Sequence, residues 1–136
     1  MIWPLPEAFI SSRYGTLENR VTRHRGLDFR AKAGTSIKAP QNGTIVLNTW
    51  SDCLGWCLVL RVWNDKRPMY WGFAHLQKKS KLKVGTKIVE GQRFCLVGNT
   101  GACSRGAHLH LTYGPTVQHI FIGATLDPEK VLRGEI

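Results

Sequence analysis

The sequence lacks any long hydrophobic run. Within its 136 residues, no stretch approaches the ~18 uninterrupted apolar residues that a membrane-spanning helix needs. The longest apolar stretch, residues 54–60, is typical of a buried strand. The amino terminus has neither the basic segment nor the apolar core of a signal peptide. We therefore expect no membrane insertion, no export by the usual route, and one domain over residues 1–136.

Acidic residues are scarce: nine Asp and Glu face nineteen Lys and Arg, which gives a net charge of +10. Such a charge predicts attraction to an anionic partner, and nucleic acid, anionic lipid and bacterial envelope polymers all qualify. No helix-turn-helix, zinc-finger, RRM or P-loop pattern is present, so we expect no nucleic-acid binding. Two basic clusters either dock the protein on envelope polymers or form a solvated face: Arg20, Arg23, Arg25 and Arg30; and Lys78, Lys79, Lys81, Lys83 and Lys87.

The four cysteines include no C-x-x-C pair, which removes support for a zinc ribbon. Because no signal peptide is apparent, we expect four reduced, partly buried thiols in preference to disulfides. The cysteines are Cys53, Cys57, Cys95 and Cys103.

Helix signals are few, and short alternating segments separated by turns dominate. The alternation of residues 108–113 places two histidines and a threonine on one face and apolar residues on the other. One helical turn is predicted over 127–132, with Asp127 as the cap and Pro128 at the first helical position. We expect a mainly β, compact antiparallel sheet with little helix. The predicted strands are 44–48, 56–63, 69–76, a short one between Gly85 and Glu90, 94–97 and 108–113.

The histidines carry the strongest chemical signal. His108 and His110 project from one face of a predicted strand, with Cα atoms roughly 6.5–7 Å apart. His24 and Asp28 flank Gly26 in a segment that we expect to bend as it enters a strand. Histidine nitrogens with one carboxylate predict a zinc site with an open position, and the absence of H-E-x-x-H excludes a helix-borne zincin site. The fifth histidine in sequence order, His119, has no such context and predicts a surface residue.

Three spaced motifs follow one another along the chain: H-x-G-x-D at 24–28, A-H-L at 74–76 and G-x-H-L-H at 106–110. In this order they resemble the M23 family of zinc metallopeptidases, the LytM or lysostaphin-type peptidoglycan endopeptidases. Residues 12–15, 34–39, 42–46, 84–92 and 126–128 also resemble family segments, so the resemblance covers about residues 9–133. It implies that His24, Asp28 and His110 bind one zinc ion per chain. It also implies that His75 and His108 are catalytic residues that do not bind the metal.

The resemblance further implies amide hydrolysis in the stem peptides or cross-bridges of peptidoglycan. Zinc would polarise the scissile carbonyl and lower the pKa of water to roughly 7. His75 and His108 would orient or deprotonate that water, stabilise the oxyanion or return a proton to the leaving amine, with the division of roles left open. Arg105 departs from the family's usual pattern, and it either meets a stem-peptide carboxylate or stays a solvated loop residue.

A catalytic domain without an export signal fits a phage endolysin, which stays in the host cytoplasm until a holin opens the membrane towards the cell wall. A virion-associated lytic protein is an alternative, and we expect a monomer in either case. A catalytically silent wall-binding or scaffold member would have lost a ligand or catalytic histidine, whereas all five positions are filled. A thiol peptidase using Cys103 and His108 would lack a helix amino terminus to activate the thiol.

Overall fold

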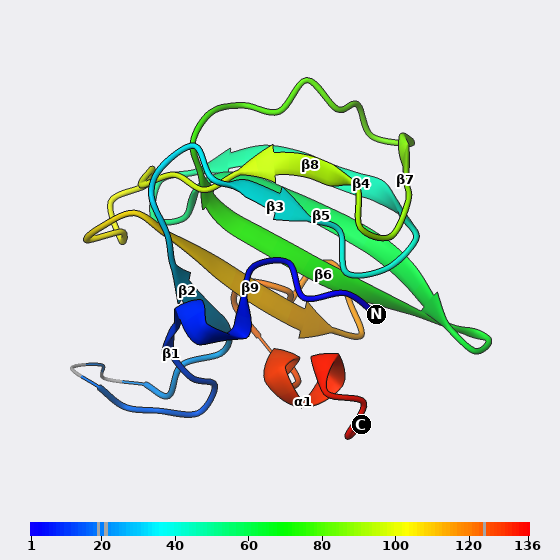
Figure 1. Ribbon diagram of the computed structural model, residues 1–136, viewed down its shortest axis with the longest axis horizontal. Helices are drawn as coiled ribbons and strands as arrows, with labels where there is room; N and C mark the ends of the chain where they lie inside the picture. The colour runs from blue at the N-terminus through cyan, green and yellow to red at the C-terminus, as the bar shows by residue number, and fades with distance from the viewer. Residues whose placement is uncertain (19, 21, 124) are drawn as a thin grey trace.

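Most of the regular structure is β-strand, as the sequence predicts. The computed structural model describes residues 1–18, 20, 22–123 and 125–136 (Figure 1). Its strands form an antiparallel sheet in the order β1-β2-β9-β6-β5-β4-β7, and β3 pairs with β8 in a second, two-stranded sheet. The elements are η1 (Glu7–Phe9), β1 (Ile10–Ser12), β2 (Leu27–Arg30), β3 (Ser36–Lys38), β4 (Gly43–Ser51), β5 (Gly55–Asn64), β6 (Arg67–Leu76), β7 (Lys87–Ile88), β8 (Arg93–Leu96), β9 (His108–Gly114) and α1 (Pro128–Leu132).

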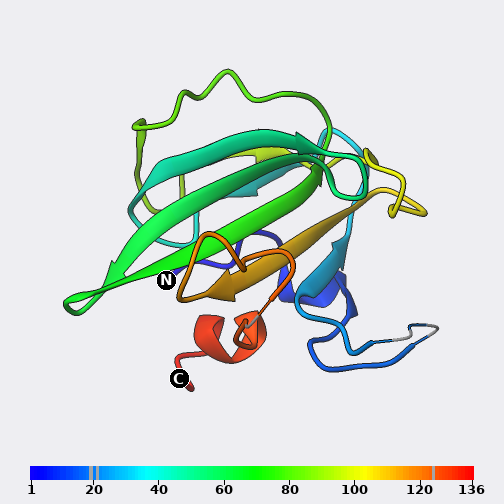
Figure 2. The ribbon, with the colours of Figure 1, turned by 180° about the vertical axis from the view of Figure 1, so that it is seen from behind.

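The hydrophobic core lies between the two sheets. In Figure 1 the β3–β8 pair lies in front of the large sheet, and Figure 2 shows β4, β5, β6 and β9 from behind. Leu109 and Leu111 of β9 point into this core and are fully buried. Phe73 of β6 packs edge to face on Phe94 of β8, with ring centroids 4.9 Å apart. Burying a side chain of this size stabilises the fold by about 1.5–3 kcal/mol.

Alternation along β9 fixes which side chains are left for chemistry. Because its leucines point into the core, His108 and His110 must project from the opposite face of the sheet. The segment after β9 covers another part of that face, where Ile120 is buried beside Gly72 of β6. The sheet thus carries its core on one face and a polar site on the other.

The helix prediction is confirmed near the carboxyl end. The Asp127 side chain accepts a hydrogen bond of 2.9 Å from the Glu129 backbone N–H, and Pro128 opens α1. This helix lies below β9 in Figure 2 and packs against it. Within the described part of the chain, no helix has the length and apolar character needed to span a membrane.

The expectation of four reduced cysteines is wrong for one pair. Cys53, in the turn between β4 and β5, forms a disulfide with Cys103, in the segment between β8 and β9, and their Cα atoms are 4.7 Å apart. The two loops approach closely because Gly101 has no side chain, and a Cβ there would collide with the Cys53 carbonyl. Cys57 and Cys95 are free thiols, as expected, and Cys57 is buried.

Candidate active site

The pairing of β2 with β9 brings a carboxylate opposite a histidine. Asp28 and His110 are directly paired in the antiparallel register, and the residues before and after Asp28 point into the core. Side chains opposed in this way have Cβ atoms about 4.5–5.5 Å apart. The His110 Nδ1 atom lies 2.9 Å from Asp28 Oδ1. The sheet itself therefore sets this contact.

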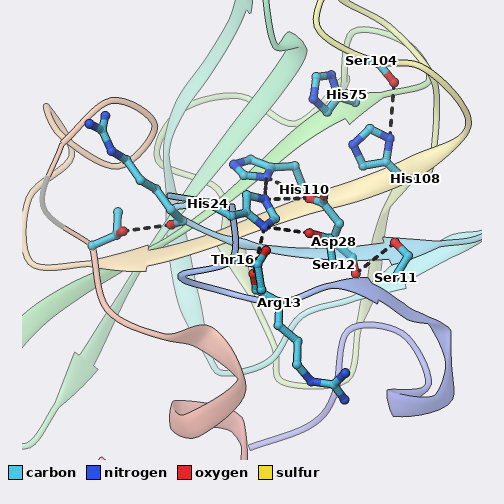
Figure 3. Close-up of polar contacts among 12 residues, drawn as sticks. Ser11, Ser12, Arg13, Thr16, His24, Asp28, His75, Ser104, His108 and His110 are labelled. Atoms are coloured by element: carbon cyan, nitrogen blue, oxygen red, sulfur yellow. Dashed lines mark hydrogen bonds and ion pairs between the residues drawn. The ribbon is translucent and has the colours of Figure 1, made fainter. Parts of the chain in front are cut away.

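His24 reaches the same point from the segment that precedes β2. Its Nε2 atom lies 3.3 Å from Asp28 Oδ1 and 3.3 Å from His110 Nδ1. Its other nitrogen, Nδ1, lies 3.2 Å from the Arg13 carbonyl oxygen, which can only accept a hydrogen bond. Nδ1 therefore carries the proton, and the Nε2 lone pair is directed at the other two residues. Figure 3 shows the three side chains converging.

Gly26 makes this approach possible. A Cβ at position 26 would lie 2.5 Å from the Leu111 carbonyl oxygen and 2.7 Å from His110 Cε1. Neither the β9 backbone nor the His110 ring can move without changing the site. The glycine in the H-x-G-x-D pattern is thus required by close packing against the ring of His110.

These three residues suit a metal ion. Their potential ligand atoms all lie within 4.8 Å of one another, and His24 and Asp28 are buried. Burial raises the pKa of the Asp28 carboxyl, but hydrogen bonds with His110 and His24 outweigh it and hold the pKa well below its usual range. An ionised carboxylate and two imidazole nitrogens are the donor set that proteins use for zinc in sites with an open position.

His75 lies beside this cluster because β6 is irregular near its end. Trp56 pairs with Leu76 and Leu58 pairs with Phe73, so β6 has one residue more than β5 over this interval. His75 adopts a φ of 60°, which is uncommon for a residue other than glycine. Such a bulge redirects a side chain, and bulges are frequent next to active sites.

The His75 ring is neutral, and its hydrogen bond fixes which nitrogen carries the proton. Its Nδ1 atom donates a hydrogen bond of 2.7 Å to the Thr100 carbonyl, which leaves Nε2 as an acceptor. Burial lowers the pKa of His75 to about 4, and repulsion by the positive forms of His108 and His110 adds to the effect. At neutral pH this imidazole therefore carries no charge.

His108 is the partner of His75 on the same side of the cluster. The centroids of the two rings are 4.7 Å apart, and the His75 and His110 centroids are 6.2 Å apart. His108 Nδ1 donates to the Gly106 carbonyl at 2.8 Å, with the Ser104 hydroxyl at 3.3 Å. In the neutral ring, Nε2 is therefore the acceptor.

All five residues singled out from the sequence thus meet at one place (Figure 3). Arg105 lines a cavity that Asp28 and His108 also line. His119 is exposed, with Nδ1 at 2.9 Å from the Thr116 hydroxyl, and takes no part. Cys103 forms a disulfide with Cys53 and has no free thiol, so the alternative of a Cys103 nucleophile is wrong.

Several residues that support the site gave no sequence signal. The Arg13 and Thr100 carbonyls hold His24 and His75, and a backbone carbonyl has no residue-specific pattern. Arg20 forms an ion pair of 3.4 Å with Asp28 Oδ2. The sequence marked it only as one member of a basic cluster.

Comparison with known proteins identifies the family. Residues 22–120 match the profile of Peptidase family M23, and the chain therefore belongs to this family. It is 32% identical over 108 residues to the peptidoglycan DD-endopeptidase ShyA of Vibrio cholerae, covering 79% of this chain and 24% of that protein. It is 30% identical over 104 residues to the murein hydrolase activator EnvC of Escherichia coli, covering 76% of this chain and 23% of that protein.

The fold agrees with a solved member of the family. The catalytic domain of lysostaphin from Staphylococcus simulans superposes with a TM-score of 0.75 at 29% identity, covering 91% of each chain. The mainly antiparallel β fold expected from the sequence is thus confirmed. The chain spans about a quarter of the length of the curated relatives ShyA and EnvC.

Proposed function

We propose that this chain is a zinc-dependent endopeptidase that hydrolyses amide bonds in the stem peptides or cross-bridges of peptidoglycan. One observation carries the proposal: three metal-binding side chains and two further histidines meet on the polar face of one sheet. The name of ShyA, a peptidoglycan DD-endopeptidase, supports this substrate class, and that of lysostaphin, an antimicrobial peptidase, supports the peptidase chemistry. The peptidase domain would cover about residues 9–133.

In this proposal, His24 Nε2, the Asp28 carboxylate and His110 Nδ1 hold one zinc ion. Zinc bound there would supply Lewis acidity, which polarises a carbonyl and makes water acidic near neutral pH. The Arg13 carbonyl fixes the orientation of His24, and the β2–β9 register fixes that of Asp28 and His110. The ligand geometry is therefore built before substrate binds.

His75 and His108 would handle the protons. Both rings bind a backbone carbonyl through Nδ1, so both can present an unprotonated Nε2 to a water molecule or substrate amide. Because the His75 pKa is about 4, this ring is neutral and able to accept a hydrogen bond at neutral pH. A positioned acid or base of this kind contributes typically about 10²–10⁴-fold in rate.

Purified cell walls provide the direct test. The zinc-loaded protein should release new amino termini and no new reducing sugar ends, since an amide is the bond attacked. A chelator should stop the reaction and added zinc should restore it, whereas a thiol-alkylating reagent should have little effect, since burial raises the pKa of the Cys57 thiol to about 12. New reducing ends without new amines would overturn the proposal.

A second candidate is a regulator without catalytic activity. Its support is the similarity to EnvC, which is named as an activator of murein hydrolases. The five filled positions favour the peptidase. Addition of this chain to a separate murein hydrolase distinguishes the two: a regulator would stimulate that enzyme while releasing no amines alone.

The route to the substrate is also part of the proposal. The Cys53–Cys103 disulfide supports action outside a reducing cytosol. We infer a monomeric phage endolysin released by a holin, with a virion-associated lytic protein as the alternative. Expression alone should leave bacteria mostly unharmed, and co-expression with a holin should cause lysis that His110→Ala abolishes. Lysis without a membrane opener would overturn the holin-dependent route.

A further inference from the structure

A positively charged cavity opens beside the candidate metal cluster. Its volume is about 310 Å³, and it lies between β1 and β2 and the segment that leads into β9. Asp28 and His108 line it, so it reaches the reacting centre. Its other charged lining residues are Arg20, Arg30, Arg105 and Glu18. Arginines therefore outnumber acids at this side of the site.

The cavity continues away from the metal cluster. A second cavity of about 770 Å³ shares Arg30, Arg105, Gly106 and Ala107 with the first and adds Lys32. Shared walls make the two cavities parts of one groove, which we call the arginine groove. A peptide that has its scissile bond at the metal cluster would extend along it.

Arg30 has a defined place in the groove. It pairs with His108 across the β2–β9 ladder, and alternation along β2 puts it on the same face as Asp28. Arg105 comes from the segment before β9 and faces the same space. These two guanidinium groups are thus presented from two different elements.

Both arginines are free to bind a ligand. Other arginine side chains make contacts within the protein: Arg23 donates to the Gly15 carbonyl, and Arg13 forms an ion pair with Glu129. Within the part of the chain that the structure describes, Arg30 and Arg105 form no side-chain hydrogen bond or ion pair. A guanidinium group with unused donors matches the two oxygens of a carboxylate.

The opposite flank of the site has a different character. A cavity of about 410 Å³ over β4, the β4–β5 turn and the segment 117–122 is lined mainly by apolar side chains, among them Leu54 and Phe121. In the sheet order, β2, β9, β6 and β5 lie between β1 and β4, which lines this flank. An anionic group would therefore be favoured on the arginine side alone.

We propose that the arginine groove binds a free carboxylate of the substrate peptide next to the scissile amide, and that Arg30 and Arg105 select for it. This inference rests on the proposed peptidase function and adds the substrate class: peptides with free carboxylates in place of amidated or neutral ones. Arg30 and Arg105 would act through substrate binding.

Two soluble probes test the selection. One is a stem tetrapeptide with its carboxylates free, and the other is the same peptide with every carboxylate amidated. In calorimetric titrations of the zinc-loaded protein, the acidic peptide should have a Kd at least about tenfold lower than the amidated one. This is the range expected for charge-assisted hydrogen bonds. Arg30→Gln with Arg105→Gln should reduce this ratio towards one.

A matched control removes the same charge elsewhere. Lys66 and Arg67 are exposed at the turn between β5 and β6, at the other end of the ten-residue strand that carries His75. The pair Lys66→Gln with Arg67→Gln should keep the selectivity of the original protein. Arg105→Gln alone, in an exposed segment, should still lower the ratio if the double variant fails to fold.

Hydrolysis of the corresponding cross-linked peptides separates the two proposals. Equal binding of both probes, or full selectivity in the arginine variants, would overturn the carboxylate site even if both substrates are cleaved. Selective binding without any cleavage by the zinc-loaded protein would overturn the peptidase function and leave the carboxylate site in place. In the arginine variants, the loss of selectivity should appear mainly as a higher KM for the acidic substrate.

Discussion

At the scale of single residues, His110 has the central position in the site. It pairs with Asp28 across the sheet, faces His24 at 3.3 Å and lies beside His75. His110→Ala should therefore lose most of its zinc, because it would remove one of the three proposed ligands. Metal analysis of the purified variant, after dialysis against trace zinc, measures this directly.

The neighbouring histidines are the natural controls. His75→Ala and His108→Ala should retain zinc while losing activity by about 10²–10⁴-fold, since neither ring belongs to the ligand cluster. If either variant lost its metal while His24→Ala kept it, the ligand and catalytic roles would be exchanged. Zinc retained in full by His110→Ala would remove this residue from the ligand set.

Gly26 shows how tightly the proposed zinc ligands are packed. In Gly26→Ala, the new methyl group would meet the Leu111 carbonyl at 2.5 Å and the His110 ring at 2.7 Å. We expect a large loss of zinc affinity and a destabilisation of about 1–3 kcal/mol, as overpacking usually produces. Isothermal titration with zinc and urea unfolding give the two quantities.

Gly134→Ala is the control for a general effect of a methyl group. Gly134 has a φ of 73°, and a Cβ added to it would meet no other atom within 4 Å. This variant should lose some stability from backbone strain and keep its zinc affinity. A Gly26→Ala protein that binds zinc as tightly as Gly134→Ala would show that β9 moves freely, contrary to our inference.

His75 should also make stability depend on pH. Burial lowers its pKa to about 4, below the usual value of 6.5. Between these pH values the unfolded chain binds more protons than the folded one, so the free energy of unfolding should rise with pH from about 4 to about 6.5. The contribution should reach at most about 1.4 kcal/mol per pH unit.

The variant His75→Gln isolates this contribution. Urea unfolding of both metal-free proteins across this pH range should show a shallower pH dependence for the variant, since glutamine does not titrate. Parallel curves for the two proteins would mean that His75 is not neutralised by burial.

Among the elements, the segment between β8 and β9 positions two of the histidines of the site. Its Thr100 carbonyl binds His75 and its Gly106 carbonyl binds His108, yet it contains no regular strand or helix. The Cys53–Cys103 disulfide fastens it to the β4–β5 turn, where the Cys103 backbone N–H also donates to the Cys53 carbonyl at 3.0 Å. Both cysteines are exposed, so a reductant can reach the bond.

Reduction of this disulfide should lower kcat while zinc stays bound. A shift of about 1 Å in a catalytic group costs up to about 100-fold, and the proposed metal ligands lie outside this segment. Activity with and without dithiothreitol, with thiols counted by a chromogenic reagent, measures the effect. The variant Cys53→Ser with Cys103→Ser should have the same low activity in both conditions. Unchanged activity after complete reduction would show that backbone contacts alone hold the segment.

Local patterns predicted some elements and missed others for physical reasons. The alternation in 108–113 and the Asp127 cap depend on neighbouring residues, and both appear as predicted in β9 and α1. The disulfide depends on how two loops separated by fifty residues approach, which no local pattern contains. Likewise, the extra residue that turns His75 towards His108 becomes visible only when β6 is paired with β5. The spaced motifs indicated the five site residues, whereas the carbonyls that orient them required coordinates.

At the scale of the whole molecule, two groups of basic residues contribute to the excess of positive charge in different ways. Arg20 and Arg30 belong to the arginine groove, while Arg23 and Arg25 donate to backbone carbonyls. The first basic cluster named from the sequence is therefore split: two of its arginines line the groove, and two form hydrogen bonds with the backbone. Four further positive charges lie together in the segment between β6 and β7, where Lys78, Lys79, Lys81 and Lys83 are all exposed.

This lysine segment should dock the protein on anionic envelope polymers. Exposed charges are screened beyond roughly 8 Å at physiological ionic strength, so binding to cell walls in a sedimentation assay should weaken as salt is added. Reversing the charges at Lys78, Lys79, Lys81 and Lys83 should weaken wall binding and wall hydrolysis more than hydrolysis of a small soluble peptide. The site residues lie on other elements, so cleavage of the soluble peptide reports whether the site is intact. Equal losses on both substrates would show that this segment supports the fold or the active site, and that the charge has no docking role.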